Sequence, residues 1–405
     1  MFRRSTLLSL ALWGMFAAAL RIAVAPPESC GRDNSTDIEQ AAHSAIDWIR
    51  SNQLPDGRYL YLYYPEPDLV SADYNDVRHA GVTMALYQAA GRFHDSDALR
   101  AADAGLAWMG QNLMREDDWA AFTATEGQAK LGASALMTAA LSERRLATGD
   151  TKYDGLMREL GRFMVALQRA DGGFYVSWLI VQREPDRSGA SRYYPGEAFW
   201  ALTLLHKAFP NEGWDAPAMR AAGFITTRRD DLEDVAFPPL ADQWAAYGLA
   251  EMAGWGLSDE QIAYARRLAE RFGFLVRTEA QREHGPFGAF VRGGEARAAG
   301  AGTWVEGLAA LWRLSASDPR LADLEPKIKE RLTCGAGILA ARQIDDEAAA
   351  SYPEPQLVRG AWLSKGETRM DDQQHSFSGL IYTIDAMLGR IRREPDAPLS
   401  GVMQR

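Results

Sequence analysis

After residue 36, hydrophobic residues recur with the period of an α-helix, and the predicted helices are of two kinds. In the first kind, charged residues occupy one face and apolar residues the other, as in helices at a protein surface. The second kind is apolar nearly all round and rich in Ala and Gly, for example “HAGVTMALYQAAG” and “SFSGLIYTIDAML”, so it is expected to be buried. The amphipathic helices are predicted at 37–53, 97–114, 153–168, 216–230, 258–276 and 321–343.

The two kinds of helix alternate strictly, six of each, which is the pattern of a repeat architecture whose helical hairpins bury one another. Six buried helices inside six amphipathic ones predict an all-α (α/α)6 toroid. The predicted organisation is an N-terminal segment at 1–36, the toroid domain at 37–392 and a tail at 393–405.

The connections between helices are unequal. Those that lead from a buried helix to the next amphipathic one are short, such as “GRFHDS” and “ATGDT”. The return connections are mostly long, at 54–75, 169–194, 277–302 and 344–372. The long loops are therefore expected on one face, where the buried helices begin, with short β hairpins walling a cleft.

These long loops contain Tyr, Trp, Phe, Gly and Pro, as in “DGRYLYLYYPEPD” and “DGGFYVSWLIVQREP”. Loops longer than about 12 to 15 residues are usually functional or disordered. Aromatic rings beside charged groups are typical of a sugar site, because the rings cover the apolar faces of pyranoses while charged groups bind the hydroxyls. Simple packing of loop aromatics is the alternative interpretation.

The N-terminal segment has the pattern of an export signal. Arg3 and Arg4 precede an apolar run at 7–20, which is short for a membrane span of about twenty residues. “AVA” at 23–25 has the form of a cleavage site, but Pro26 would follow the cut. Cleavage and retention as a membrane anchor are both open. The sequence predicts a periplasmic or extracellular protein that contacts the membrane through this segment only.

Charge and cysteine content exclude several classes of protein. The formal net charge of −10 argues against nucleic acid or an anionic membrane surface as the main partner, since both need a net basic face. With Cys30 and Cys334 as the two cysteines, at most one disulfide can form, and a thiolate zinc site is excluded. We expect no metal or cofactor, and we expect a monomer.

Polar residues gather in the first turns of the buried helices, on the face where the long loops lie. Capping and the helix dipole favour acidic residues there by about 0.3–1 kcal/mol each, so capping competes with catalysis at every position. Capping does not account for Glu306 and His375, which lie among apolar residues, because a buried charge is costly unless paired or used. The best catalytic candidates are Glu197, Asp242 and Glu306, with Asp76 next.

The first buried helix opens with “DYNDVRHAG”, in which Asn75 or Asp76 is predicted to cap the helix. Capping gives no reason for the consecutive Arg78 and His79, which are therefore predicted to point into the pore, towards Glu306 or His375. The candidate substrate-binding residues are Arg78, His79, His375, Glu126, Asp372, Arg192, Tyr74 and Trp304.

Many arginines also occur in the long loops and at the helix starts, among them Arg78, Arg192, Arg297 and Arg369. Guanidinium groups pair bidentately with carboxylates and phosphates, so an anionic glycan is one candidate ligand. In the competing interpretation, these arginines pair with the acidic residues of the ring itself.

Two Q-x-x-D-G elements, “QLPDG” at 53–57 and “QRADGGF” at 168–174, look like the turns that follow outer helices in toroid enzymes. With the helical repeat, they make residues 37–392 resemble the (α/α)6 and α/α-toroid superfamilies: six-hairpin glycosidases, polysaccharide lyases, sugar epimerases and terpene-cyclase-like proteins. “DDLED” at 230–234 fits the magnesium-diphosphate pattern of terpene synthases, but it closes an outer helix, where acidic clusters are usually solvated.

The resemblance implies a glycan-active enzyme, and we expect a glycoside hydrolase that acts through a pair of carboxyl groups in the pore. Two alternatives remain open. A histidine or tyrosine base would give a uronate lyase or a sugar epimerase. A toroid without catalytic activity would bind a glycan or a protein partner in the assembly of an envelope polymer.

Overall fold

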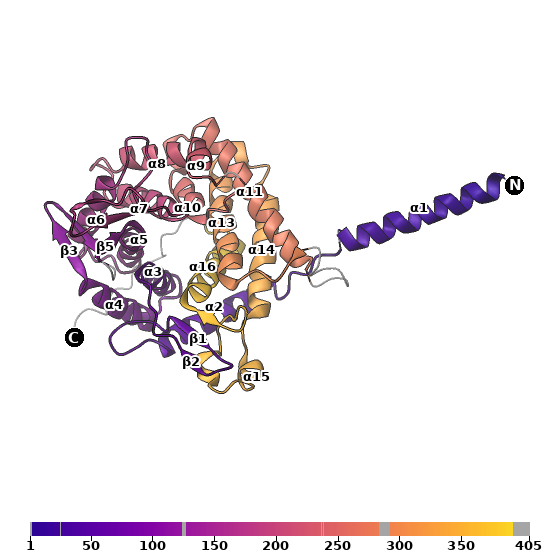
Figure 1. Cartoon of the computed structure of the whole chain (residues 1–405), viewed down its shortest axis with the longest axis horizontal. Coiled ribbons are helices and arrows are strands. Elements are labelled where there is room, and N and C mark those ends of the chain that lie inside the picture. The colour runs from indigo at the N-terminus through magenta and orange to yellow at the C-terminus, as the bar shows by residue number, and fades with distance from the viewer. Residues whose placement is uncertain are drawn as a thin grey trace.

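Six buried helices form a closed inner ring in the part of the chain that the structure, a computed structural model, describes (Figure 1). The described residues are 2–24, 26–123, 127–235, 237, 239–282 and 292–391. Each inner helix packs against the next along the chain, and the last packs against the first. The inner helices are α3 (Asp76–Phe93), α5 (Leu131–Thr148), α7 (Tyr194–Ala208), α10 (Gln243–Glu251), α13 (Ala298–Ser317) and α16 (Met370–Met387).

The amphipathic helices lie outside this ring, each packed on one or two inner helices (Figure 1). Their apolar faces point inward, because an amphipathic helix gains stability by burying that face. This arrangement confirms the predicted (α/α)6 toroid. The outer helices are α2 (Ser35–Ser51), α4 (Ser96–Gly110), α6 (Asp154–Ala166), α8 (Asp215–Thr227), α11 (Asp259–Ala280) and α14 (Glu325–Arg342).

The two Q-x-x-D-G elements have the same geometry and join neighbouring outer helices. Gln53 donates its side-chain amide to the carbonyls of Gly57 and, on α4, Ala101. Gln168 donates in the same way to the carbonyls of Gly172 and, on α8, Pro217. Both glycines have a left-handed backbone, with φ of 96° and 94°, which an L side chain rarely adopts.

Within the described residues, short strands in the long connections form three small antiparallel sheets. In the first, β1 (Leu62–Tyr64) lies between β2 (Leu69–Val70) and β8 (Thr368–Arg369), so it joins the loops before the first and last inner helices. The second pairs β3 (Leu113–Glu116) with β4 (Trp119–Phe122), and the third orders β5 (Gln128–Lys130), β6 (Ser177–Leu179) and β7 (Glu184–Pro185). The remaining short helices are α9 (Arg229–Leu232), η1 (Ala253–Trp255), η2 (Pro319–Leu321), α15 (Asp346–Ala349) and η3 (Pro355–Leu357).

The N-terminal helix α1 (Phe2–Val24) extends away from the toroid (Figure 1). Its apolar side chains, among them Leu7, Trp13 and Phe16, are exposed. Within the described residues, no helix combines the length and the apolarity needed to cross a membrane. Membrane anchoring and export both stay predictions.

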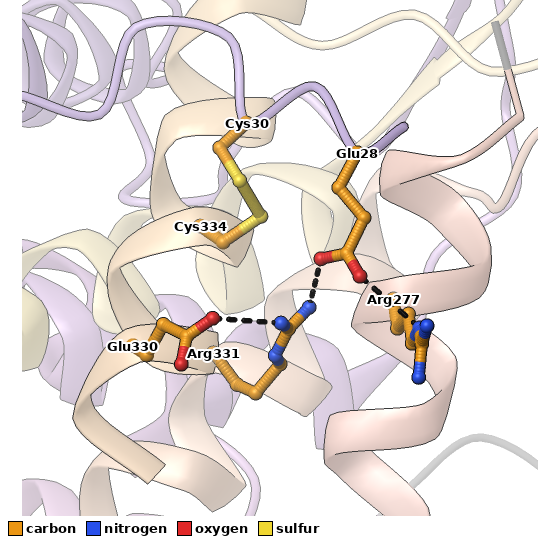
Figure 2. Close-up of a disulfide and its surroundings, with 6 residues drawn as sticks. All are labelled: Glu28, Cys30, Arg277, Glu330, Arg331 and Cys334. Atoms are coloured by element: carbon orange, nitrogen blue, oxygen red, sulfur yellow. Dashed lines mark hydrogen bonds and ion pairs between the residues drawn. A yellow bond between two sulfur atoms is a disulfide. The ribbon is translucent and has the colours of Figure 1, made fainter. Parts of the chain in front are cut away.

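A disulfide between Cys30 and Cys334 joins the segment after α1 to the outer helix α14 (Figure 2). Figure 2 also shows Glu28 of this segment between the guanidinium groups of Arg277 on α11 and Arg331 on α14, with which it forms ion pairs. The segment is thus fixed across two outer helices. The one disulfide that the cysteine count allows is formed.

Candidate active site

A pocket of about 470 Å³ lies where the inner helices begin, on the face that carries the long loops. Each of the six inner helices, or the residue just before it, contributes to the lining. The wall combines aromatic rings with amide, guanidinium and carboxyl groups, as expected of a site for a polar small molecule. Its residues are Asn75, Val77, Arg78, Leu136, Tyr193, Tyr194, Glu197, Gln243, Trp244, Arg297, Ala299, Gly300, Thr303, Arg369, Asp371, Gln374 and His375.

One wall of the pocket contains a histidine that is held by a buried carboxyl group. His375 Nδ1 lies 2.7 Å from Oε2 of Glu306, which is fully buried on the neighbouring helix α13. Tyr247 donates its hydroxyl to the other carboxyl oxygen of Glu306 at 3.1 Å. Burial raises the pKa of Glu306, and the contact with His375 opposes that rise.

The close approach of two inner helices makes this contact possible. A Cβ atom on Gly302 of α13 would lie 2.5 Å from the backbone of His375 and Ser376 on α16. Glycine therefore lets the two backbones approach closely enough for the Glu306 and His375 side chains to meet. The imidazole is 14% exposed, and its Nε2 has no hydrogen-bond partner among the residues that the structure describes.

Glu197 lies in the first turn of α7 and lines the same pocket. The residue is 4% exposed, and its Oε2 is buried without a hydrogen-bond partner in the described part of the chain. Burial raises the pKa of Glu197 to about 8, and the negative charge of Asp242 adds to the rise. At neutral pH, Glu197 is therefore a protonated acid.

The arginines of the pocket wall are paired with carboxylates. Asp371 accepts from Arg369 at 2.8 Å and contacts Arg78 at 3.2 Å. Burial alone would raise the pKa of Asp371, but these guanidinium groups outweigh it and lower that pKa. Arg297 binds Asp372 through two hydrogen bonds of 3.0 and 2.7 Å. The wall is thus charge-balanced, and an anionic substrate receives no added support from it.

Asp372 lies behind this wall as a structural clamp. It is fully buried, and besides Arg297 it accepts a hydrogen bond of 2.9 Å from the backbone N–H of Ala299. Through these contacts, Asp372 joins the start of α16 to the start of α13. Asp372 holds Arg297 and does not itself line the pocket.

The structure places His79 away from the pocket. Its ring is fully buried between α3 and α4, where Nε2 lies 2.9 Å from the carbonyl oxygen of Gly105 and Nδ1 lies 2.6 Å from the hydroxyl of Tyr74. Tyr74 packs against Trp108 and His79 and does not line the pocket. His79 therefore does not point into the pore as predicted, since it and Tyr74 pack between the inner and outer helices.

Burial lowers the pKa of His79 to about 3, which predicts a loss of stability in acid. The unfolded chain binds a proton at this site below about pH 6.5 and the folded chain does not, so the free energy of unfolding decreases as the pH falls from 6.5 towards 3. We expect a contribution on the order of a few kcal/mol at the acid end. Urea unfolding of wild type and His79→Gln between pH 7 and 4 should show a flatter pH dependence in the variant. The exposed His43→Gln control should follow wild type, and equal slopes for all three proteins would refute the assignment.

Two of the expected catalytic carboxylates are held in ion pairs outside the pocket lining. Asp242 is fully buried, pairs with Arg229 and accepts a hydrogen bond of 3.1 Å from the backbone N–H of Ala245, so it caps α10. Asp76 contacts the ammonium group of Lys130 at 3.1 Å. Both residues lie at the starts of inner helices, and neither lines the pocket.

The remaining candidate site residues lie in different parts of the structure. Arg78 lines the pocket, and Asn75 caps α3 by accepting from the backbone N–H of Arg78 at 3.0 Å. Arg192 is exposed on the loop before α7 and does not line the pocket. Trp304 is half-buried against the core and is absent from the lining. Glu126 and the predicted tail at 393–405 lie outside the described residues.

Comparison with solved structures identifies the architecture. A D-mannose isomerase superposes with a TM-score of 0.61 at 13% identity, over 88% of this chain and 98% of the isomerase. A cellobiose 2-epimerase from Spirochaeta thermophila gives 0.59 at 15% identity, over 87% and 97% of the two chains. The chain has the (α/α)6 toroid fold of these structures.

Hydrolases share the same fold. A family 76 glycoside hydrolase (mannosidase) from Bacteroides thetaiotaomicron superposes with a TM-score of 0.57 at 8% identity, over 87% of this chain and all of the hydrolase. No family model and no curated protein sequence matches the chain. The comparisons therefore identify the fold, and the reaction is inferred from the residues of the pocket.

Several pocket residues were not singled out by the sequence analysis. Tyr193 and Tyr194 come directly before Pro195 in the first turn of α7, and this Tyr-Tyr-Pro sequence was the available signal. Asp371 forms a doublet with Asp372, and the two carboxylates face different partners. Trp244 and Gln243 start α10 next to Asp242 and carried no separate signal.

In the described residues, no group of three or more His, Cys, Asp or Glu side chains is arranged to hold a metal ion.

Proposed function

We propose that the protein is a sugar-active enzyme that removes a proton from a carbon next to a sugar carbonyl, as in a sugar epimerase or isomerase. The observation that carries this proposal is the pair formed by His375 and Glu306. A histidine that acts as a base needs one ring nitrogen held in place and the other free to accept a proton. Glu306 holds Nδ1 of His375, and Nε2 has no protein partner among the described residues.

The rest of the pocket supports a sugar as the substrate. Tyr193, Tyr194 and Trp244 provide flat apolar surfaces, and Gln243 and Gln374 provide amide groups for hydroxyls. The pocket volume of about 470 Å³ fits a small molecule rather than a long polymer enclosed in the ring. Because the arginines are already paired with carboxylates, we propose a neutral sugar.

The positions of the four candidate carboxylates also favour proton abstraction over the expected hydrolysis. Asp76 is paired with Lys130, Asp242 with Arg229, and Glu306 with His375. Of the four, Glu197 alone lines the pocket. This arrangement gives no support to a hydrolase that uses two of these four carboxyl groups.

Product analysis tests the proposal. Purified protein is incubated with D-mannose, cellobiose and an α-mannan oligosaccharide, and the products are separated by anion-exchange chromatography. We expect an isomeric sugar of unchanged chain length from at least one of the first two. New reducing ends would indicate hydrolysis, an unsaturated product absorbing in the near ultraviolet would indicate a lyase, and binding without turnover would indicate a binding protein. Each of these three outcomes contradicts the proposal.

Glycoside hydrolysis is the second candidate, and one observation favours it. Glu197 is protonated at neutral pH, while Asp371 lines the same pocket with a lowered pKa and is therefore ionised. One carboxylic acid and one carboxylate are the groups that most glycosidases use. The release of reducing ends from the oligosaccharide, lost in both Glu197→Gln and Asp371→Asn, would establish this candidate.

We also propose that the protein is exported. The basic and apolar pattern of α1 supports export, and so does the disulfide between Cys30 and Cys334, because such bonds persist in oxidising compartments. Protein isolated from the cell envelope and denatured without reductant should therefore carry no maleimide-reactive thiol. Two reactive thiols in freshly isolated protein would contradict export.

A further inference from the structure

We propose that Glu197 is the second proton-transferring residue of this pocket and donates to the face of the sugar opposite His375, so that the reaction inverts the carbon. This inference rests on the proposed function and gives it a stereochemical outcome. A single base would return the proton to the face of the carbon from which it came, and the configuration would be kept. Two proton-transferring groups on opposite walls remove a proton from one face and add a proton to the other, which inverts the configuration.

The order of the inner helices places the two residues on opposite walls. The ring runs α3, α5, α7, α10, α13, α16 and back to α3, so α7 and α16 are three positions apart (Figure 1). Glu197 lies in the first turn of α7, and His375 lies in the second turn of α16. Both line the pocket, which therefore lies between them.

The surroundings of Glu197 leave it no structural partner. Its Oε2 is sealed against α5, where a Cβ atom on Gly132 would lie 2.4 Å away. No described residue forms a hydrogen bond or an ion pair with its carboxyl group, although burying an unpaired polar group is costly. Such an unpaired buried group is typical of a functional site.

Burial, with the nearby charge of Asp242, keeps the proton on Glu197 at neutral pH. Asp242 is itself paired with Arg229. Lys130, Asp76, Arg78, Tyr193 and Tyr194 are titratable groups at the same ends of the neighbouring helices. Farther along α5 and α10, which pack on α7, lie Glu143, Arg144, Arg145, Tyr247 and Glu251.

The proposed reaction balances without an added oxidant or reductant. His375 takes the proton as the C–H bond next to the carbonyl breaks, and the electron pair moves into the carbonyl to give an enediolate. Glu197 then donates its proton to the opposite face of the same carbon, and the carbonyl re-forms. One proton has moved from Glu197 to His375, and exchange with water or a turnover in reverse restores the starting state.

Turnover in D2O tests the inference with D-mannose and cellobiose as probes, followed by proton NMR at the carbon next to the carbonyl. Wild type should produce the epimer and label it with deuterium. In Glu197→Gln, we expect deuterium still to enter recovered substrate through His375, while epimer formation falls by about 100-fold or more. Glu197→Asp should restore part of the epimer formation.

Three outcomes would overturn the inference. One is a wild-type rate of epimer formation in Glu197→Gln. Another is a joint loss of exchange and epimer formation that Glu197→Asp does not restore. Absence of deuterium labelling in wild type itself would show that the proposed function has failed, and the wild-type sample alone would reveal it.

Infrared spectroscopy tests the protonated state of Glu197 without any substrate. The difference between wild type and Glu197→Gln at pH 7 should contain the carbonyl stretch of a protonated carboxylic acid, which disappears near pH 8. Asp242→Asn should lower the pH of that transition, because it removes the negative charge that raises it. A difference spectrum at pH 7 with the bands of an ionised carboxylate alone would contradict the proposed role.

Discussion

His375→Ala is expected to lower kcat/KM by about 10² to 10⁴ on the sugar that wild type converts, because that range is what a positioned acid–base residue contributes. The substitution opens space beside Glu306 at the pocket wall. Added imidazole should therefore enter this space and restore part of the rate. The measurement is steady-state turnover with and without imidazole, together with the melting temperature of each protein.

His206→Gln is the matched control for this variant. His206 lies in the last turn of an inner helix, far from the first turns that line the pocket, and its ring packs against Trp255. The His206→Gln variant should retain wild-type turnover. If His375→Ala folds and keeps wild-type turnover, or if imidazole gives no rescue of a folded and inactive variant, His375 is not the base.

Arg229→Met is expected to lower the free energy of unfolding by about 3–5 kcal/mol, since it leaves the charge of Asp242 buried without its partner. Both side chains are fully buried, and Arg229 also donates to the hydroxyl of Tyr264 at 2.7 Å. The double variant Arg229→Met, Asp242→Asn should recover most of the loss, because the amide oxygen can still cap α10. Urea unfolding measures both variants.

The exposed ion pair of Arg266 and Asp323 provides the control, since Arg266→Met should cost less than about 1 kcal/mol. This comparison tests the assignment of Asp242 to structure rather than catalysis. If Arg229→Met were as stable as wild type but inactive, Asp242 would belong to the active site after all.

The helices of the toroid were predictable because the local pattern of apolar and polar side chains determines which helix faces are buried. A segment that is apolar nearly all round, such as the one that forms α7, has no polar face to expose to water, whereas the segment that forms α11 has one charged face. The short strands were expected only as hairpins in the long loops. The pairing of β1 with β8 brings together chain segments about three hundred residues apart, and no local pattern specifies such a partner.

The pocket was predictable only in part, because the direction of a side chain depends on its angle around the helix. Arg78 and His79 are adjacent, so they point about 100° apart, and one faces the pocket while the other faces α4. The partner of Asp242 is Arg229, which lies 13 residues earlier at the start of the short helix α9 and becomes a neighbour only through folding. Glu306 and His375 were recognisable because their polar groups interrupt apolar helices.

The proposed function depends on the removal of a carbon-bound proton in the central pocket. The most direct test is proton NMR of D-mannose and cellobiose incubated in D2O with wild type and with His375→Ala. Wild type is expected to exchange the hydrogen next to the carbonyl of at least one of these sugars for deuterium, and His375→Ala is expected not to. Conversion of either sugar by wild type without any deuterium at that carbon would contradict the proposed function.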